Sequence, residues 1–136
     1  MIIDAKDMIV GRLATFVAKK ALMGEEITIV NSEKAVITGN PKEILEEYKK
    51  KRSRGAALIG PYFPKGSERI LKRIIRGMLP YKQPRGREAL DRVKCYNGIP
   101  KEFEGKEKSY KEFNVSKTYA NFVTLGRISK ELGAKQ

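Results

Sequence analysis

The sequence predicts a single α/β domain, a three-layer sandwich whose central sheet is mainly parallel, has roughly four strands and is flanked by helices. Two observations support this fold class. Short runs rich in β-branched residues alternate with segments of helical periodicity, and one such run follows a helical segment of the length that a parallel crossover needs. With 136 residues, 40% of them hydrophobic, the chain is long enough to bury a core without disulfides or bound metal.

The first elements are a short strand, a helix and a second strand. Residues 2–3 form an apolar run, and helical periodicity then extends from Gly11 to a glycine stop at Gly24. Residues 26–31 are rich in β-branched side chains, which is typical of a strand covered on both faces. A further apolar run at 35–37 predicts another short strand, so these segments provide the first half of the sheet.

The next helix has a strong start signal and a basic end. Asn40 is a favourable N-cap residue, Pro41 occupies the first helical position and Glu43 the third. The helix then runs into lysines and arginines at 49–54, before Gly55. Cations suit a helix C-terminus, but five in six residues exceed what capping requires. The run therefore indicates a binding role.

The segment at 65–87 organises the predicted binding surface. On a helix, its basic residues fall on one arc and its apolar residues on the opposite arc. Such a helix can pack on its own domain with one face and offer cations to a polyanion with the other. Ser67 is the expected N-cap, and Pro80 is expected to stop the helix after Leu79. The basic arc holds Arg69, Lys72, Arg73 and Arg76, the apolar arc holds Ile70, Leu71, Ile74, Ile75 and Met78, and a following loop with Pro84 and Gly86 carries Lys82, Arg85 and Arg87.

The rest of the chain completes the sheet and then becomes irregular. We expect a short helix at 88–92 and a strand at 93–96. Residues 100–117 are polar and mixed in charge, and are expected to be mostly irregular chain wrapped over the domain. Periodicity that returns at 119–132 predicts a closing helix with Gly133 as its stop. The whole chain thus forms one domain with an irregular, helix-ended C-terminal extension from about residue 100.

The charge distribution indicates a polyanionic partner. The chain has 29 Lys and Arg against 16 Asp and Glu, a formal net charge of +13. Between Lys49 and Arg87 there are thirteen basic residues and one acid, Glu68, so nearly all of the excess lies in that block. A charge run is usually only a solvated face, but a surface that needed only solubility would intersperse both signs. Frequent arginine, with Tyr62, Phe63 and Tyr81 interleaved, favours nucleic acid over an acidic protein.

Other candidate sites have weaker support. The absence of histidine excludes histidine-based triads and most zinc sites. Asp4 and Asp7 lie near a strand end without a catalytic partner, and Cys95 in its strand is expected to be a buried small hydrophobe. Gly11 and Gly39 precede helical segments, where amide groups can face a phosphate, but the chain has no dinucleotide or P-loop motif. We therefore expect no catalytic residue, no metal and no cofactor.

The sequence also favours an intracellular location. Cys95 is the single cysteine, so no intrachain disulfide can form and a reducing compartment is the simpler expectation. The N-terminus lacks the pattern of a signal peptide, and no stretch approaches the roughly 18 consecutive apolar residues of a membrane span. We expect a soluble cytoplasmic protein.

A set of motifs, in order along the first three quarters of the chain, resembles a known family. The most specific is RGMLPYK at 76–82. The family is that of the thirteenth protein of the large ribosomal subunit, in its archaeal and eukaryotic-cytosolic form. The further matching motifs are DA at 4–5, GRLA at 11–14, VNSEKAVITG at 30–39, GREAL at 86–90 and YNGIP at 96–100, and TLGRIS at 124–129 resembles the tail of the archaeal branch.

The resemblance implies a non-catalytic structural constituent of the large ribosomal subunit. Its implied partners are large-subunit ribosomal RNA and neighbouring ribosomal proteins, with no membrane and no small-molecule substrate, and its implied role includes early subunit assembly on cytoplasmic ribosomes. The alternatives are a non-ribosomal RNA- or DNA-binding protein and, less favoured, a nucleotide-dependent enzyme. Carried onto this chain, the RNA-facing residues are Lys49, Lys50, Lys51, Arg52, Arg54, Arg69, Lys72, Arg73, Arg76, Lys82, Arg85 and Arg87.

Overall fold

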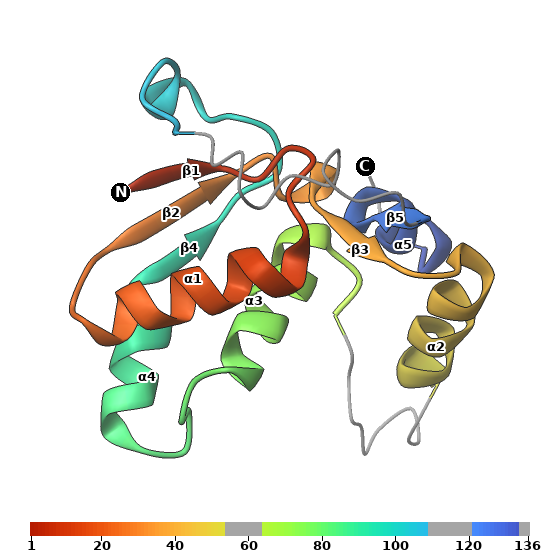
Figure 1. The fold of residues 1–136 in the computed structure, drawn as a ribbon, viewed down its shortest axis with the longest axis horizontal. Helices are drawn as coiled ribbons and strands as arrows, with labels where there is room; N and C mark the ends of the chain where they lie inside the picture. The colour runs from red at the N-terminus through yellow and green to blue at the C-terminus, as the bar shows by residue number, and fades with distance from the viewer. Residues whose placement is uncertain (54–63, 109–120, 134–136) are drawn as a thin grey trace.

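The computed structural model describes residues 1–53, 64–108 and 121–133, and these residues form the α/β fold that the sequence predicts. Within them, three parallel strands in the order β1–β2–β4 make the main sheet, and β3 and β5 make a small antiparallel sheet (Figure 1). The strands are β1 Ile2–Asp4, β2 Ile27–Val30, β3 Val36–Thr38, β4 Val93–Cys95 and β5 Phe122–Thr124, and the helices are α1 Val10–Leu22, α2 Pro41–Ser53, α3 Ser67–Gly77, α4 Pro84–Asp91 and α5 Leu125–Glu131.

The β1–α1–β2 unit confirms the predicted parallel crossover. Ile3 of β1 pairs with Ile29 of β2 in parallel register, and α1 connects the two strands. After α1 the chain reverses at Gly24, whose φ of 95° lies in the left-handed region. Glycine adopts this conformation without the steric cost that a side chain would add, so the predicted glycine stop is confirmed.

Helices α1, α3 and α4 cover the same face of the main sheet (Figure 1). α1 packs against both α3 and α4, and both of these helices contact β4. Because the strand order advances in one direction, right-handed crossovers place all the connecting helices on one side. On the opposite face, Thr28 of β2 is half-buried and its neighbour Lys94 of β4 is exposed. Cover of residues 26–31 is therefore less complete on that face than the sequence predicted.

In the part of the chain that the structure describes, Lys108 alone occupies the position of a fourth strand. Lys108 forms a parallel bridge with Ile3 at the outer edge of β1. The backbone N–H of Lys108 donates to the Ile2 carbonyl, and the N–H of Asp4 donates to the Lys108 carbonyl, each at 2.9 Å. The sequence suggested roughly four strands, and within the described residues the main sheet consists of three strands and this bridge.

The small sheet joins two segments that lie far apart in the sequence. β3 pairs antiparallel with β5, with Val36 opposite Thr124. Residues 122–124, expected within the closing helix, are therefore a strand, and α5 begins after them. Thr124 caps α5, because its Oγ1 accepts a hydrogen bond from Arg127 N at 3.2 Å. Gly133, with a φ of 89°, follows the end of α5 as predicted.

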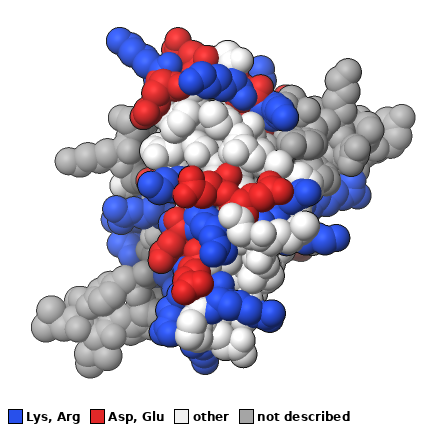
Figure 2. Space-filling view, turned by 90° about the vertical axis from the view of Figure 1, so that its left-hand side faces the viewer, with Lys and Arg blue, Asp and Glu red and all other residues white. Residues whose placement is uncertain are grey.

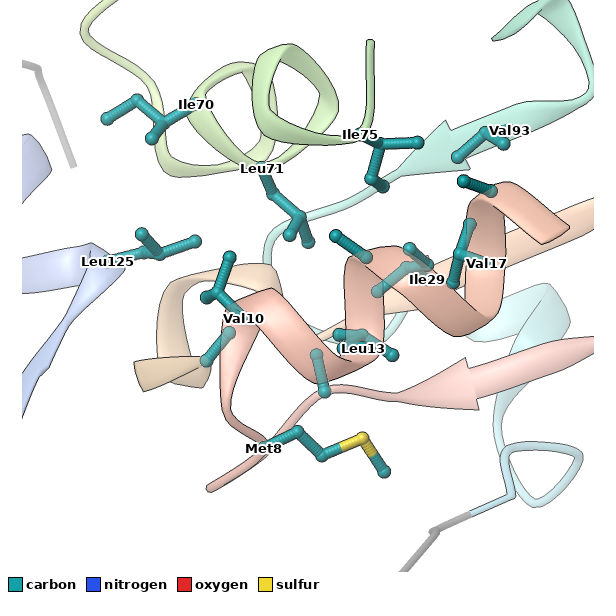
Figure 3. Close-up of a cluster of buried hydrophobic side chains, with 14 of the residues drawn as sticks. Met8, Val10, Leu13, Val17, Ile29, Ile70, Leu71, Ile75, Val93 and Leu125 are labelled. Atoms are coloured by element: carbon teal, nitrogen blue, oxygen red, sulfur yellow. The ribbon is translucent and has the colours of Figure 1, made fainter. Parts of the chain in front are cut away.

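The core lies between α1, α3 and the main sheet (Figure 3). Leu13 and Val17 of α1 meet Leu71 and Ile75 of α3, with Ile29 of β2 beside them. All five side chains have 0% exposure. Burying an aliphatic side chain of this size contributes about 1.5–3 kcal/mol, so this cluster fixes the position and rotation of α3.

Leu71→Ala should lower the free energy of unfolding by about 2–5 kcal/mol, because it removes fully buried contacts and leaves a cavity. Leu22→Ala is the matched control, since Leu22 is 39% exposed, and it should change stability by well under half of that amount. Urea unfolding followed by circular dichroism measures both. Equal losses in the two variants would contradict the position of α3 in the core.

Candidate nucleic-acid interface

α3 carries the predicted amphipathic pattern. Ile70, Leu71 and Ile75 have 0% exposure on the face that meets the core. Met78, which the pattern placed on the apolar arc, is 42% exposed because α3 ends at Gly77. The predicted stop after Leu79 is therefore two residues too late. The opposite face of the helix carries the partly or fully exposed cations Arg69, Lys72, Arg73 and Arg76.

The start of α3 differs from the prediction. The N-cap residue is Gly66, no side chain caps the helix, and Ser67 is its first residue, with 3% exposure. Glu68 Oε2 accepts a hydrogen bond from Asn97 Nδ2 at 2.6 Å. The one acid of the basic block is thus tied to the chain just after β4, and this bond anchors the first turn of α3 at the carboxyl end of the sheet.

The turn after α3 is tight and closely packed. Tyr81 N donates to the Leu79 carbonyl at 2.8 Å, and Gln83 N donates to the Pro80 carbonyl at 2.9 Å. Leu79 is 4% exposed and anchors the turn in the core. A Cβ atom on Gly86 would lie 1.9 Å from the Pro80 oxygen, so this close approach of two backbone segments requires glycine.

α4 begins earlier than the sequence predicted. The expected helix covered 88–92, but the observed one starts at Pro84, because proline presets the first helical φ angle and needs no N–H partner there. Arg85 and Arg87 are therefore exposed residues of the first turn of a helix rather than of a loop. Lys82 remains in the preceding turn and is exposed.

The basic run at the end of α2 is partly paired with acids of the same chain. Lys49 Nζ lies 3.4 Å from Glu131 Oε2, and Lys51 Nζ lies 3.5 Å from Glu47 Oε1. All four side chains are more than a third exposed, and surface ion pairs of this kind contribute little to stability. They leave the lysines accessible to a polyanion. Arg54, also predicted to bind RNA, lies outside the described residues.

Two neighbouring hollows join the end of α2 to the basic face of α3. One, of about 670 Å³, lies between Arg52 and the first turns of α3, and the other, of about 250 Å³, continues along α3. Arg69 and Arg73 line both, so the two hollows adjoin, and Glu68 is the one acid among their lining residues. Together we call them the basic groove, and its cations are Arg52, Lys65, Arg69, Lys72, Arg73 and Arg76.

The fold brings some of the predicted residues into this groove and leaves others on neighbouring surfaces. Arg52 joins the four cations of α3 there, although it comes from a different helix. The lining of the two hollows does not include three α2 lysines or the three cations around the start of α4. Those residues are Lys49, Lys50, Lys51, Lys82, Arg85 and Arg87.

Two cations that lie close to those of α3, Lys65 and Lys94, are absent from the set of binding residues predicted from the sequence. Lys65 lines the larger hollow, and its place directly before the α3 segment is a signal that could have identified it. Lys94 of β4 lines a third hollow, of about 290 Å³, together with Arg69 and Lys72. No local signal marks Lys94, because only the packing of α3 against β4 brings it there.

The cationic excess is not spread evenly over the molecule. Figure 2 shows the face at the amino ends of the main-sheet strands, where acidic and basic side chains lie side by side. Exposed residues of both signs lie at this end, including Lys19 near the end of α1, Glu26 before β2 and Asp91 at the end of α4. A mixed surface of this kind has the composition expected of a face that needs only to be solvated.

The other candidate sites have structural explanations. Asp4 Oδ1 accepts hydrogen bonds from Lys6 N at 3.0 Å and from Asn31 Nδ2 at 2.9 Å, so it holds the chain between β2 and β3. The backbone N–H of Gly39 donates to the Asn121 carbonyl at 2.8 Å rather than facing outward.

Within 1–53, 64–108 and 121–133, no three His, Cys, Asp or Glu residues gather as metal ligands. No helix in these ranges is long and apolar enough to cross a membrane.

Together these features define a class of protein, an α/β domain with a row of cations on the outer face of one amphipathic helix. Residues 1–102 match the model of the family described as Ribosomal protein L13. The chain is 48% identical to the large ribosomal subunit protein uL13 of Methanococcoides burtonii and to that of Methanocaldococcus jannaschii, in each case over 98% of both chains. It is also 48% identical to the uL13 protein of Archaeoglobus fulgidus, over 97% of this chain and 86% of the relative.

The chain therefore belongs to the ribosomal protein L13 family, and the resemblance seen in its motifs is confirmed. The matched region contains β1 to β4 and α1 to α4, and hence the whole basic groove.

Cys95 should react slowly with iodoacetamide in the folded protein. Burial raises the pKa of this thiol from 9.0 to about 12, with Lys72 opposing the shift, so at pH 8 only about one thiol in ten thousand is ionised. Unfolding in urea restores the ordinary pKa and should accelerate alkylation by roughly a thousandfold. Mass spectrometry of timed samples measures this, and equal rates in the two states would show that the thiol is not buried.

Proposed function

We propose that this protein is a constituent of the large ribosomal subunit that binds large-subunit ribosomal RNA through the basic groove and supports early assembly of the subunit. Its family membership supports this proposal, as do the names of its archaeal relatives. The observation that carries it is the arrangement of α3, which buries Ile70, Leu71 and Ile75 in the core while its cations line a groove shared with the end of α2.

The groove fits RNA by charge and by rigidity. Arginine and lysine neutralise phosphates and release counterions, and the planar guanidinium group can bind a phosphate through two hydrogen bonds. Because Ile70, Leu71 and Ile75 lock the rotation of α3, its cations are held in a fixed row before RNA arrives. Less conformational entropy is then lost on binding. Such contacts recognise the shape of a folded RNA more than its sequence.

The remaining parts of the proposal concern setting and partners. The protein acts in the cytoplasm as part of the ribosome, beside neighbouring ribosomal proteins, and contributes structure rather than catalysis, without a cofactor or small-molecule substrate. Lys82, Arg85 and Arg87 extend the cationic surface beyond the groove and provide further phosphate contacts.

Replacing Arg69, Arg73 and Arg76 together by Gln should weaken binding to in vitro transcribed large-subunit ribosomal RNA, with little change in thermal stability, because surface charges contribute little to folding. Filter binding at several salt concentrations measures this. For six to ten phosphate contacts, affinity of the wild type should fall by about three to five decades between 50 and 200 mM salt, by analogy with duplex DNA, and the variant should show a shallower slope.

The matched control replaces three exposed lysines outside the groove, Lys19, Lys101 and Lys106, by Gln, which removes the same net charge. This control should bind RNA nearly as tightly as the wild type. Equal weakening of both triple variants would mean that net charge alone drives binding, and a variant that unfolds while the folded fraction still binds would mean that the three arginines are structural.

Competition and sedimentation address the ribosomal part of the proposal. Structured large-subunit RNA should displace the bound protein at lower concentration than duplex DNA of equal length. In cell lysate, the protein should co-sediment with large ribosomal subunits and their precursors. Preference for duplex DNA, or sedimentation apart from ribosomal particles, would favour a non-ribosomal nucleic-acid-binding protein instead.

A further inference from the structure

Tyr81 differs from the other tyrosines that the structure describes. Tyr48 is 7% exposed in the core, and the partly buried ring of Tyr96 lies 5.7 Å from that of Phe103. Tyr81 is 37% exposed, and the guanidinium carbon of Arg76 lies 4.7 Å from the centre of its ring. This cation–π contact occupies one face of the ring, and more than a third of the residue's surface remains accessible.

The backbone holds Tyr81 in one position. The turn that carries it is closed on both sides by the hydrogen bonds of Tyr81 N to Leu79 O and of Gln83 N to Pro80 O. Leu79 is buried in the core, and Pro80 is in close backbone contact with Gly86 of α4. An aromatic ring on so constrained a turn is already ordered for a ligand, so less entropy is lost when it binds one.

Tyr81 also stands at the end of the basic groove. Arg76 lines the smaller hollow of the groove together with Arg69 and Arg73, and the same Arg76 side chain lies over the Tyr81 ring. A phosphate held by the groove cations would therefore place the attached nucleotide next to an aromatic face. Met78, 42% exposed, adds apolar surface in the same stretch of chain.

We propose that Arg76 and Tyr81 form a stacking platform for one unpaired nucleobase of the bound RNA, with the phosphates on either side of that nucleotide in or near the basic groove. This inference rests on the proposed function and makes it more specific, because the ligand must offer an unstacked base at a loop, a bulge or a strand end. A continuous duplex hides the faces of its bases and cannot supply that contact.

The first test compares Tyr81→Leu with the wild type on in vitro transcribed large-subunit ribosomal RNA. Loss of one stacked base should weaken binding about 5- to 150-fold, and the salt slope should stay unchanged because stacking releases no counterion. Tyr81→Phe keeps the ring and should bind within about threefold of the wild type. Phe122→Leu, at an exposed aromatic of β5 that is 45% exposed, is the matched control and should have no effect.

The second test makes use of the absence of tryptophan from this chain. Tyr81→Trp places a single tryptophan on the platform, where a stacked base should quench its emission when RNA binds. Phe122→Trp places the reporter on β5, where emission should stay unchanged. This reporter reads the contact directly, so the result stands even if Tyr81→Leu lowers stability.

The outcomes separate this inference from the proposed function. Suppose that the wild type binds ribosomal RNA in a salt-dependent manner. If Tyr81→Leu then binds equally well, or if Tyr81→Trp emission does not change on binding, the proposed stacking platform is wrong, while RNA binding through the basic groove still stands. If the wild type itself shows no salt-dependent binding, the proposed function is wrong. Quenching by a continuous RNA duplex as strong as that by RNA with a bulged nucleotide would also overturn the requirement for an unpaired base.

Discussion

The structure depends on the burial of one face of α3. Ile70, Leu71 and Ile75 are fully buried against α1 and the main sheet, and this contact decides where every cation on the other face points. The helix has no side-chain cap at its start, so its position depends on packing and not on capping. The apolar contact therefore has two consequences, since it completes the core and it orders the basic surface.

Around that contact, a hydrogen bond, a close backbone contact and an ion pair join elements that lie apart in the sequence. The bond from Asn97 to Glu68 ties the first turn of α3 to the end of β4, and the close approach of Gly86 to Pro80 sets α4 against the turn that follows α3. The Lys49–Glu131 pair links α2 to α5. The first two contacts hold α3 and the turn after it in place, while the exposed Lys49–Glu131 pair contributes little. A rigid groove loses less entropy when it binds a polyanion.

Much of the fold was predictable, and the failures have identifiable physical causes. Strands β1, β2 and β4 and helices α1 and α2 lie where periodicity and capping residues place them, including the Asn40 cap, whose Oδ1 accepts from Lys42 N at 3.0 Å. The start of α4 was placed too late because Gly86 resembles a helix breaker, although it serves a close backbone contact. Residues 122–124 were assigned to a helix because their partner, β3, is far away in the sequence.

The amphipathic character of α3, the concentration of positive charge in one block and the family resemblance can all be read from the sequence, because they depend on residue identity and local spacing. The packing of distant elements is what makes Arg52 and Lys65 share a groove with α3, lets Lys94 line a hollow together with Lys72, and leaves Tyr81 exposed under Arg76. The physical reason is that helical periodicity is a property of neighbours within a few residues. Convergence of side chains from different elements follows from sheet register and helix packing, which join residues that no local pattern connects.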